Sequence, residues 1–470
     1  MKKIFASIGA VALGAAAVHG ESASSMSMGG DNSKVWSVGA SLRGFYDDNY
    51  TTAPDGPTKR DSFGATISPS ISFKFPMDQT TIGFRYIYGA TWYADRQDLV
   101  GGSHAWDQSH EFDALFSHAF SSRYSLDVSD SFVISQEPEL INSGGPISFP
   151  YRTDGDNIRN HGEITLNGGI TKRLSFVLGY QNTYYDYDNE SPGGKNNVDS
   201  GAGTVDSSLS GLLDRVEHEG LFNLRFQAMP KTVLVGGYNY RQVNYLSDEN
   251  VANASGMPGT NNLYSVITPG TPPVTNLVNG SNDFRKANTR DSRSHIVYAG
   301  VDQNFTKDLI LKVRGGVQFT EYYNAPANEP NDANTTPWGS ISLTYNYLPG
   351  SSVQVGFTHS RNQTDVVSPN PANGSLTSDQ ETSLIYGNIT HRITPRLTGR
   401  LTAQWQDSEF YGGLYDALSE RYLDLGVNFT YNFNRYFSGE VGYNYSKLDS
   451  DAAGRDFDRN RVYIGVSAAY

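Results

Sequence analysis

Apolar and polar residues alternate along most of this chain, and the alternation is clearest in the last fifty residues. From Arg421 onward an apolar side chain recurs at every second position, in the run Leu423, Leu425, Val427, Phe429, Tyr431 and Phe433. The final segment repeats the pattern with Val462, Ile464, Val466 and the terminal Tyr470. A period of two that persists for about ten residues and ends on an aromatic is typical of a transmembrane β-strand. Taken alone, the segment could also be an edge hairpin of a soluble sandwich.

The same unit of strand, tight turn, strand and long polar loop recurs from residue 36 to the end. The alternation predicts about 18 strands, an even number within the range of bacterial outer-membrane barrels. Before the three strands of the last fifty residues, these are 36–46, 63–75, 82–92, 111–120, 124–134, 158–170, 174–185, 216–228, 232–245, 295–305, 309–322, 338–347, 353–359, 383–393 and 397–405. The alternation is weakest in 111–120 and 383–393. We therefore expect an all-β fold, a single closed antiparallel transmembrane barrel with short periplasmic turns and long extracellular loops. Its last strand should pair with 36–46 to remove both sheet edges.

Composition agrees with such a barrel. Hydrophobic residues make up 37% and the mean hydropathy is −0.47, because alternating strands average to a low hydropathy. The 30 Tyr, 23 Phe and 48 Gly suit interfacial aromatic girdles and closely packed strands. Cysteine is absent, which excludes disulfides, thiolate metal sites and cysteine-based catalysis.

The N-terminus carries an export signature. Lys2 and Lys3 precede an apolar stretch, and small residues at Val18 and Gly20 fit a cleavage site before Glu21. We predict a signal peptide at 1–20, a disordered periplasmic lead-in at 21–33 and the barrel at 34–470, in the outer membrane of a Gram-negative-type cell. Cleavage would take the formal net charge from −13 to −15, which does not suggest a nucleic-acid partner.

The alternation also predicts which charged side chains point inward, since charge on the lipid-facing side costs a few kcal/mol. Six cationic and six anionic residues fall on this face: Arg85, Arg225, Lys312, Arg314, Arg400 and Arg461, with Glu163, Glu217, Glu219, Asp302, Asp424 and Glu440. They would line a water-filled lumen, or else pair across the wall and only fill it. The balance of charge assigns no ion selectivity. The longest loop, 247–290, could fold inward as a constriction or form a surface cap.

No catalytic or metal-binding constellation emerges. Glu217 and Glu219 would face the lumen while His218 faces the opposite way, so this triplet cannot converge on one reactive atom. The pair His110-Glu111 has no partner placed by spacing. Residues 186–190 begin like a calcium loop but lack its central glycine and terminal glutamate. We predict no enzymatic activity, no cofactor and no metal.

The hairpin repeats and the aromatic last strand resemble bacterial outer-membrane β-barrel proteins across nearly the whole mature chain. The units HRITPRLTGRLTAQW and FTYNFNRYFSGEVGYNY resemble the putative β-barrel porins, a grouping that includes barrels tied to exopolysaccharide export. The resemblance implies passage of small solutes or of a polysaccharide chain, with stacked inward aromatics such as Tyr463 expected for the latter. A plugged barrel acting as a scaffold or adhesin, and a conduit sheathing another protein, are the alternatives.

Outer-membrane lipids and the barrel-assembly machinery are the expected partners, and the oligomeric state stays open. Val462, Ile464, Val466 and Tyr470 resemble the C-terminal signal that the assembly machinery reads.

Overall fold

The computed structural model describes residues 35–57, 59–96, 105–135, 156–188, 209–253, 284–325, 333–370, 375–452 and 454–470. Within these ranges 18 strands form one sheet, and two short strands, β10 (Asn250–Asn253) and β11 (Phe284–Lys286), form a separate hairpin. The strands of the large sheet are β1 (Trp36–Asp47), β2 (Ser62–Pro76), β3 (Thr80–Tyr93), β4 (Trp106–Ala119), β5 (Tyr124–Ser135), β6 (Asn157–Gly169), β7 (Leu174–Tyr187), β8 (Arg215–Met229), β9 (Thr232–Tyr245), β12 (Ser292–Asn304), β13 (Leu309–Tyr322), β14 (Ala333–Leu348), β15 (Ser351–Gln363), β16 (Thr377–Arg392), β17 (Leu397–Gly412), β18 (Ser419–Asn432), β19 (Phe437–Ser450) and β20 (Phe457–Ala469).

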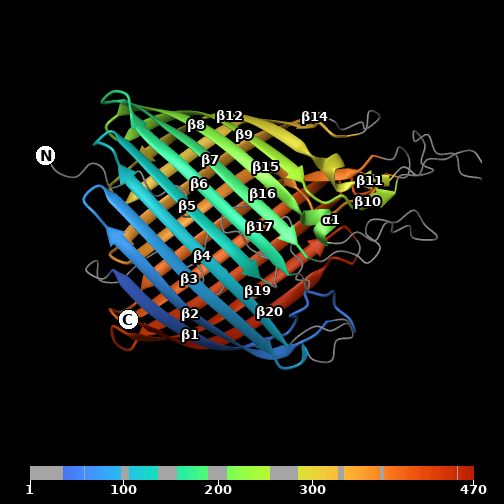
Figure 1. Cartoon of the computed structure of the whole chain (residues 1–470), viewed down its shortest axis with the longest axis horizontal. Coiled ribbons are helices and arrows are strands. Elements are labelled where there is room, and N and C mark those ends of the chain that lie inside the picture. The colour runs from blue at the N-terminus through green and yellow to red at the C-terminus, as the bar shows by residue number, and fades with distance from the viewer. Residues whose placement is uncertain are drawn as a thin grey trace, which may run out of the picture.

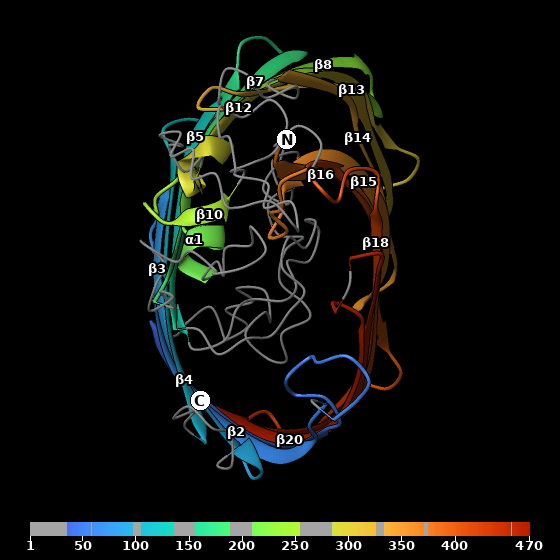
Figure 2. The same ribbon diagram turned by 90° about the vertical axis from the view of Figure 1, so that its right-hand side faces the viewer.

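The large sheet closes on itself. Each strand pairs antiparallel with its neighbours in chain order, and β9 pairs with β12 across the β10–β11 hairpin. β1 pairs both with β2 and with β20, where Gly39 lies opposite Ala469 and Asp47 opposite Arg461. Closure leaves no free sheet edge, which is what a spanning sheet requires in lipid. The strands are tilted (Figure 1), and the ring is oval in the end-on view (Figure 2). The predicted fold class and strand number are confirmed.

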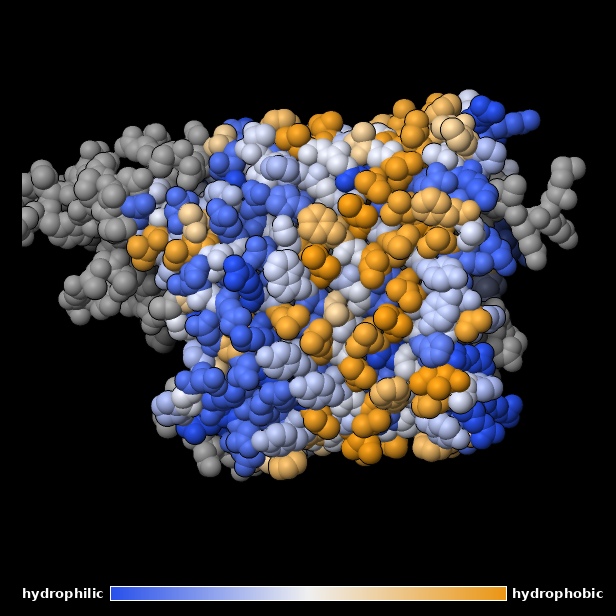
Figure 3. Space-filling view, turned by 180° about the vertical axis from the view of Figure 1, so that it is seen from behind, coloured by the Kyte–Doolittle hydropathy of each residue, from blue (hydrophilic) through white to orange (hydrophobic). Residues whose placement is uncertain are grey.

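At every second position an apolar side chain points to the outer face of the wall, as the pattern predicts. On β20 the side chains of Val462, Ile464 and Val466 are 51%, 68% and 55% exposed, whereas the intervening Tyr463 is 8% exposed. Figure 3 shows the result on one face of the barrel, a hydrophobic band between two hydrophilic zones. A closed wall with an apolar outer band is the architecture of outer-membrane barrels, and the protein is an outer-membrane barrel.

Four of the short turns are stabilised by the same side-chain hydrogen bonds, which the sequence encodes. At Thr171, Thr306 and Thr394 the side-chain hydroxyl accepts hydrogen bonds from the N–H groups two and three residues further on. Asn434 does the same with its side-chain carbonyl. These side chains satisfy donors that a tight reversal leaves free, so each Thr or Asn fixes the position at which two strands reverse.

Several strands extend further at the extracellular end than the alternation predicts. β4 begins at Trp106 instead of residue 111, β15 ends at Gln363, β16 begins at Thr377 and β17 ends at Gly412. Beyond the lipid there is no reason for outward positions to be apolar, so the alternation fades while the backbone ladder continues. Helix α1 (Leu209–Leu213), the 3-10 helix η2 (Ala287–Arg290) and the β10–β11 hairpin lie at this end (Figure 1). The predicted signal peptide and lead-in lie outside the described residues.

Candidate functional site

The twelve charged residues predicted to face inward all lie on strands, at positions that alternate with the exposed apolar side chains. Six of them belong to ion pairs. Arg85 bonds to Glu111 at 2.8 Å and Asp113 at 2.7 Å, and Glu440 accepts from Arg43. Glu217 bonds to Arg215 and Arg241, while Asp302 accepts from both Arg225 and Arg314.

The other six have different surroundings. Glu163, Glu219 and Asp424 accept hydrogen bonds from Thr165, Asn239 and Ser446. The guanidinium of Arg461 lies 3.9 Å from the centre of the Phe45 ring. Lys312 and Arg400 make no hydrogen bond or ion pair with any residue in the described part of the chain.

Inward charges are distributed unevenly around the ring. On β4 and β5 the inward charged residues, among them Glu111, Asp113 and Asp127, are acidic, and Arg85 of β3 pairs with the first two. On β13 the inward charged residues, Lys312 and Arg314, are both cations. Figure 2 shows β3 and β5 along one side of the oval and β13 along the other. The acidic residues of β4 and β5 and the cations of β13 therefore lie on different parts of the interior wall.

Residues 360–370 and 375–380, at the extracellular ends of β15 and β16, leave the wall and extend into the interior; we call them the crossing segment. Arg241 on β9 donates to Asn362 at 3.3 Å and to Gln363 at 2.8 Å. Three strands, β12, β13 and β14, separate β9 from β15 in the ring. At about 4.8 Å per strand, roughly 19 Å of wall lies between them. The end of β15 must therefore bend inward, and Figure 2 shows β15 and β16 inside the oval.

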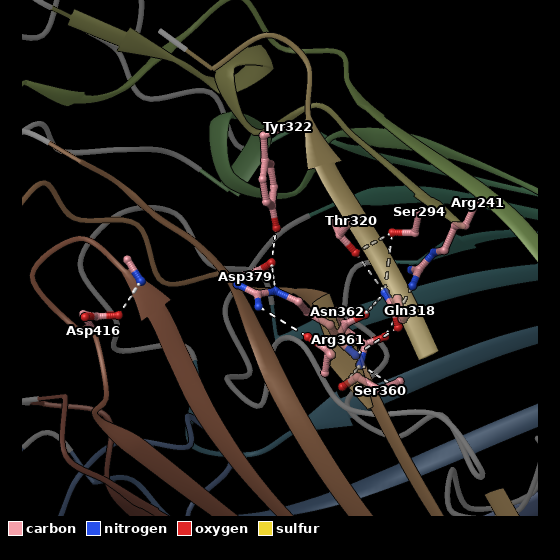
Figure 4. A network of polar contacts seen from close by, with 12 residues as sticks. Arg241, Ser294, Gln318, Thr320, Tyr322, Ser360, Arg361, Asn362, Asp379 and Asp416 are labelled. Atoms are coloured by element: carbon pink, nitrogen blue, oxygen red, sulfur yellow. Dashed lines mark hydrogen bonds and ion pairs between the residues drawn. The ribbon is translucent and has the colours of Figure 1, made fainter. Parts of the chain in front are cut away.

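The bend turns the outer face of this hairpin against the inner face of the wall. The β14–β15 ladder reaches the pair Gly339–His359 and does not continue beyond it. Beyond that pair the side chain of Gln318 on β13 bonds to the backbone of β15. It donates to the carbonyl of Arg361 at 3.0 Å and accepts from the Arg361 N–H at 3.3 Å. Arg361 also binds Asp379 through two nitrogens, and the hydroxyl of Tyr322 donates to the same carboxylate (Figure 4). This buried triad fixes the hairpin to the wall.

Two arginines hold the crossing segment further along. Arg290 of η2, 1% exposed, donates to the carbonyls of Thr364 at 3.1 Å and of Leu212 in α1 at 2.8 Å. Arg455, between β19 and β20, bonds to Asp365 at 2.9 Å and to Glu420 at 2.7 Å. Although burial opposes its charge, these carboxylates hold the pKa of the Arg455 guanidinium above its ordinary value.

Arg290 and Arg455 lie at different parts of the ring. Arg290 immediately precedes β12, and Arg455 precedes β20. The crossing segment therefore spans between separate stretches of wall at the extracellular mouth. Its far side packs on the β17–β18 connection, where a Cβ added to Gly413 (φ 67°) would lie 2.2 Å from the carbonyl oxygen of Ser368.

The sequence predicts either a constriction or a surface cap in a different loop, residues 247–290. The structure describes residues 247–253 and 284–290 of that loop. There Val251 and Ala287 pack with Val243 and Tyr245 in a small cluster at the extracellular end. The apolar patch that suggested a constriction, Leu263 to Ile267, lies outside the described residues, so this hypothesis stays a prediction. The residues that hold the crossing segment, Arg241, Arg290, Arg361 and Arg455, were not identified from the sequence.

The pKa of a carboxyl group beside α1, that of Asp214, is raised. Burial raises the pKa of Asp214 to about 7, although the Ser210 hydroxyl and the Tyr187 N–H donate to it at 2.5 and 2.8 Å. The charges of Asp186 and Glu249 act in the same direction as burial. Asp214 lies between α1 and β8, beyond the end of the strand.

We expect the stability of α1 to depend on pH through Asp214. Because the pKa is higher in the folded than in the unfolded state, its stabilising effect is complete below about pH 4 and is lost as the pH rises through about 7. Hydrogen-exchange protection of residues 210–214, corrected for intrinsic rates, should fall between about pH 5 and about pH 8. Asp214→Asn should abolish this dependence. Equal pH dependence in the variant would contradict the assignment.

Two features are absent from the described ranges. No helix there is long and apolar enough to cross a membrane. No group of three or more His, Asp or Glu side chains is placed to hold a metal ion.

Comparison with known proteins confirms the resemblance to outer-membrane barrels. Residues 370–470 match the family described as "Putative beta-barrel porin 2", a range that contains both quoted sequence units. No curated protein matches significantly.

Among solved structures, OccK9 (OpdG) of Pseudomonas aeruginosa is 13% identical, with a TM-score of 0.44, over 93% of this chain and 98% of that one. OccAB4 of Acinetobacter baumannii is 11% identical, with a TM-score of 0.41, over 93% and 99%. The FrpB iron transporter of Neisseria meningitidis is 11% identical, with a TM-score of 0.42, over 89% and 62%. At these similarities no substrate is transferred to this chain.

Proposed function

We propose that this porin-like barrel is a channel through which small polar solutes cross the outer membrane, narrowed at its extracellular mouth by the crossing segment. One observation carries the proposal. The outer face of the wall is apolar while charged and amide side chains occupy the inner face, an arrangement suited to a hydrated interior. Many inward charges pair within the wall, as with Arg43 and Glu440, which keeps them from blocking the path.

The placement of inward aromatics favours small solutes over a polymer. Tyr463 packs with Phe45, Tyr50 and Tyr93 in a buried cluster and is only 8% exposed. The Tyr463 ring is already covered by the guanidinium of Arg43 at 4.1 Å. A polysaccharide moving along the axis would need stacking faces at successive depths. Export of a polysaccharide is therefore the second candidate.

Planar-bilayer recording of the purified barrel tests the proposal, since a channel should give discrete conductance steps. A filled barrel serving as a scaffold should give none.

A further inference from the structure

A cationic cluster stands on the inner wall close to the periplasmic end, centred on Asp302 of β12. The Asp302 carboxylate accepts from Arg225 of β8 at 2.7 Å and from Arg314 of β13 at 2.5 Å. Lys312 lies directly opposite Asp302 in the β12–β13 register and bonds to no residue in the ranges that the structure describes. Three cations thus surround one carboxylate.

The two arginines differ in how many donors remain available. Arg314 lies flat on the wall, where a Cβ on Gly300 would come within 2.6 Å of its Cδ. Its second amino group donates to the carbonyls of Val301 and Val313. The side chain of Arg225 is 24% exposed, whereas that of Arg314 is 14% exposed. Arg225 donates to Asp302 through one of its amino groups. The free donors of the cluster are therefore on Arg225 and Lys312.

This excess of positive charge distinguishes the cluster from the other inward ion pairs of the described wall. Arg85 meets two carboxylates, Glu111 and Asp113. Arg215 and Arg241 share Glu217, and Glu219 adjoins them. Around Asp302 the formal charge is +2. Cations held this close without matching counter-charges attract an anion from solution.

We propose that Arg225, Lys312 and Arg314 form a binding subsite for an oxyanion, a solute bearing a phosphate or carboxylate group. A guanidinium fork beside an ammonium group matches the several acceptor oxygens of such a group. Asp302 orients the arginines and limits the affinity, so that an anion binds and is released. The subsite lies three to five residues from the periplasmic ends of β8 and β13, at the periplasmic exit of the channel. The inference deepens the proposed function by naming a solute class, and transport of that class rests on it.

Binding is tested without relying on conduction. Inorganic phosphate added to the detergent-solubilised wild-type barrel in phosphate-free buffer should show phosphorus NMR line broadening that saturates with concentration. Lys312→Gln and Arg225→Gln should each weaken this binding about tenfold, the effect of losing one charge-assisted hydrogen bond.

Arg400→Gln is the matched control. Arg400, like Lys312, is the fourth residue of a strand that leaves a periplasmic turn and has no described partner, but β17 is four strands from β13. It should bind phosphate as the wild type does. Equal weakening in Arg400→Gln would mean a general electrostatic effect, and unchanged binding in Lys312→Gln would exclude the subsite. Unsaturable broadening in the wild type would also overturn it.

Bilayer recordings separate the two proposals. Phosphate should reduce wild-type single-channel current, and Lys312→Gln should relieve the block while Arg400→Gln should not. Conductance steps without any phosphate effect would overturn the subsite and leave the channel intact. Saturable phosphate binding without conductance would support the subsite and contradict the channel.

Discussion

Replacing residues 364–376 with an Asn-Gly turn is expected to raise the single-channel conductance at least about twofold, because the interior of an 18-stranded barrel is wide enough for an aqueous path once its mouth is cleared. The crossing segment is held by Arg290 at one stretch of wall and by Arg455 at another. Removing residues 364–376 should leave the strands intact, since the β15–β16 ladder reaches Gln363 and Asp379 without them. Single-channel recording in planar bilayers measures the change.

A point variant gives the same test with less perturbation. Arg290→Gln leaves the carbonyls of Thr364 and Leu212 without their buried donor, at a local cost of about 1–3 kcal/mol for each unsatisfied group. The crossing segment should then fluctuate and the current become noisier. Arg293→Gln is the control, because Arg293 pairs with Glu321 on the exposed outer surface. If the replacement of 364–376 leaves conductance unchanged, the crossing segment does not narrow the path.

Deleting Tyr470 is expected to reduce the amount of folded barrel about tenfold. Its N–H donates to Val38 at 2.9 Å and its carbonyl accepts from the Val38 N–H at 3.2 Å, at the seam where β20 meets β1. Its ring lies 5.7 Å from Trp36 and 5.9 Å from Tyr436. Hydrogen bonds of about 1 kcal/mol and ring contacts of about 0.5–1.5 kcal/mol are lost together at the last step of closure.

The deletion separates assembly from conduction. Heat-modifiable mobility of the barrel in outer-membrane fractions gives the folded fraction, and the conductance of the surviving barrels should equal that of the wild type. Tyr470→Phe keeps the ring and the backbone bonds and should assemble normally. Wild-type levels of the truncated protein would show that the terminal aromatic is no assembly signal.

The alternation of residues sufficed to predict the barrel because lipid imposes the same requirement on every strand. Even 111–120 and 383–393, where the pattern is weakest, are strands β4 and β16. Turn chemistry at Thr171 or Asn434 is equally local. These features depend on neighbours in sequence or on the membrane, both of which can be inferred from one chain.

The crossing segment could not be predicted this way. Its chain bends inward, and the bend places residues at outward positions of the alternation against the inner wall. Arg361 and Asp379 occupy outward positions and would be placed on the lipid side, yet they are 4% and 2% exposed and contact the inner wall. The sequence does contain one indication of the inward bend. Charge at an outward position is costly in lipid, so a strand end that carries Arg361 must leave the membrane or turn inward.

Ion pairs between strands that are far apart in the sequence could not be predicted from local patterns either. Glu440 and Arg43 are separated by nearly the whole chain and meet because β19, β20 and β1 are consecutive in the closed ring. Once closure is assumed, such pairs could be predicted from register, but only with an accurate count of residues in every turn.

The central claim, that this barrel conducts solutes, is tested most directly by recording the purified wild-type protein in a planar bilayer in symmetric potassium chloride. Discrete, reproducible and ohmic conductance steps are expected, and they should become larger when residues 364–376 are replaced. An absence of steps from barrels shown by circular dichroism and heat-modifiable mobility to be folded, in both the wild type and the replacement variant, would contradict it.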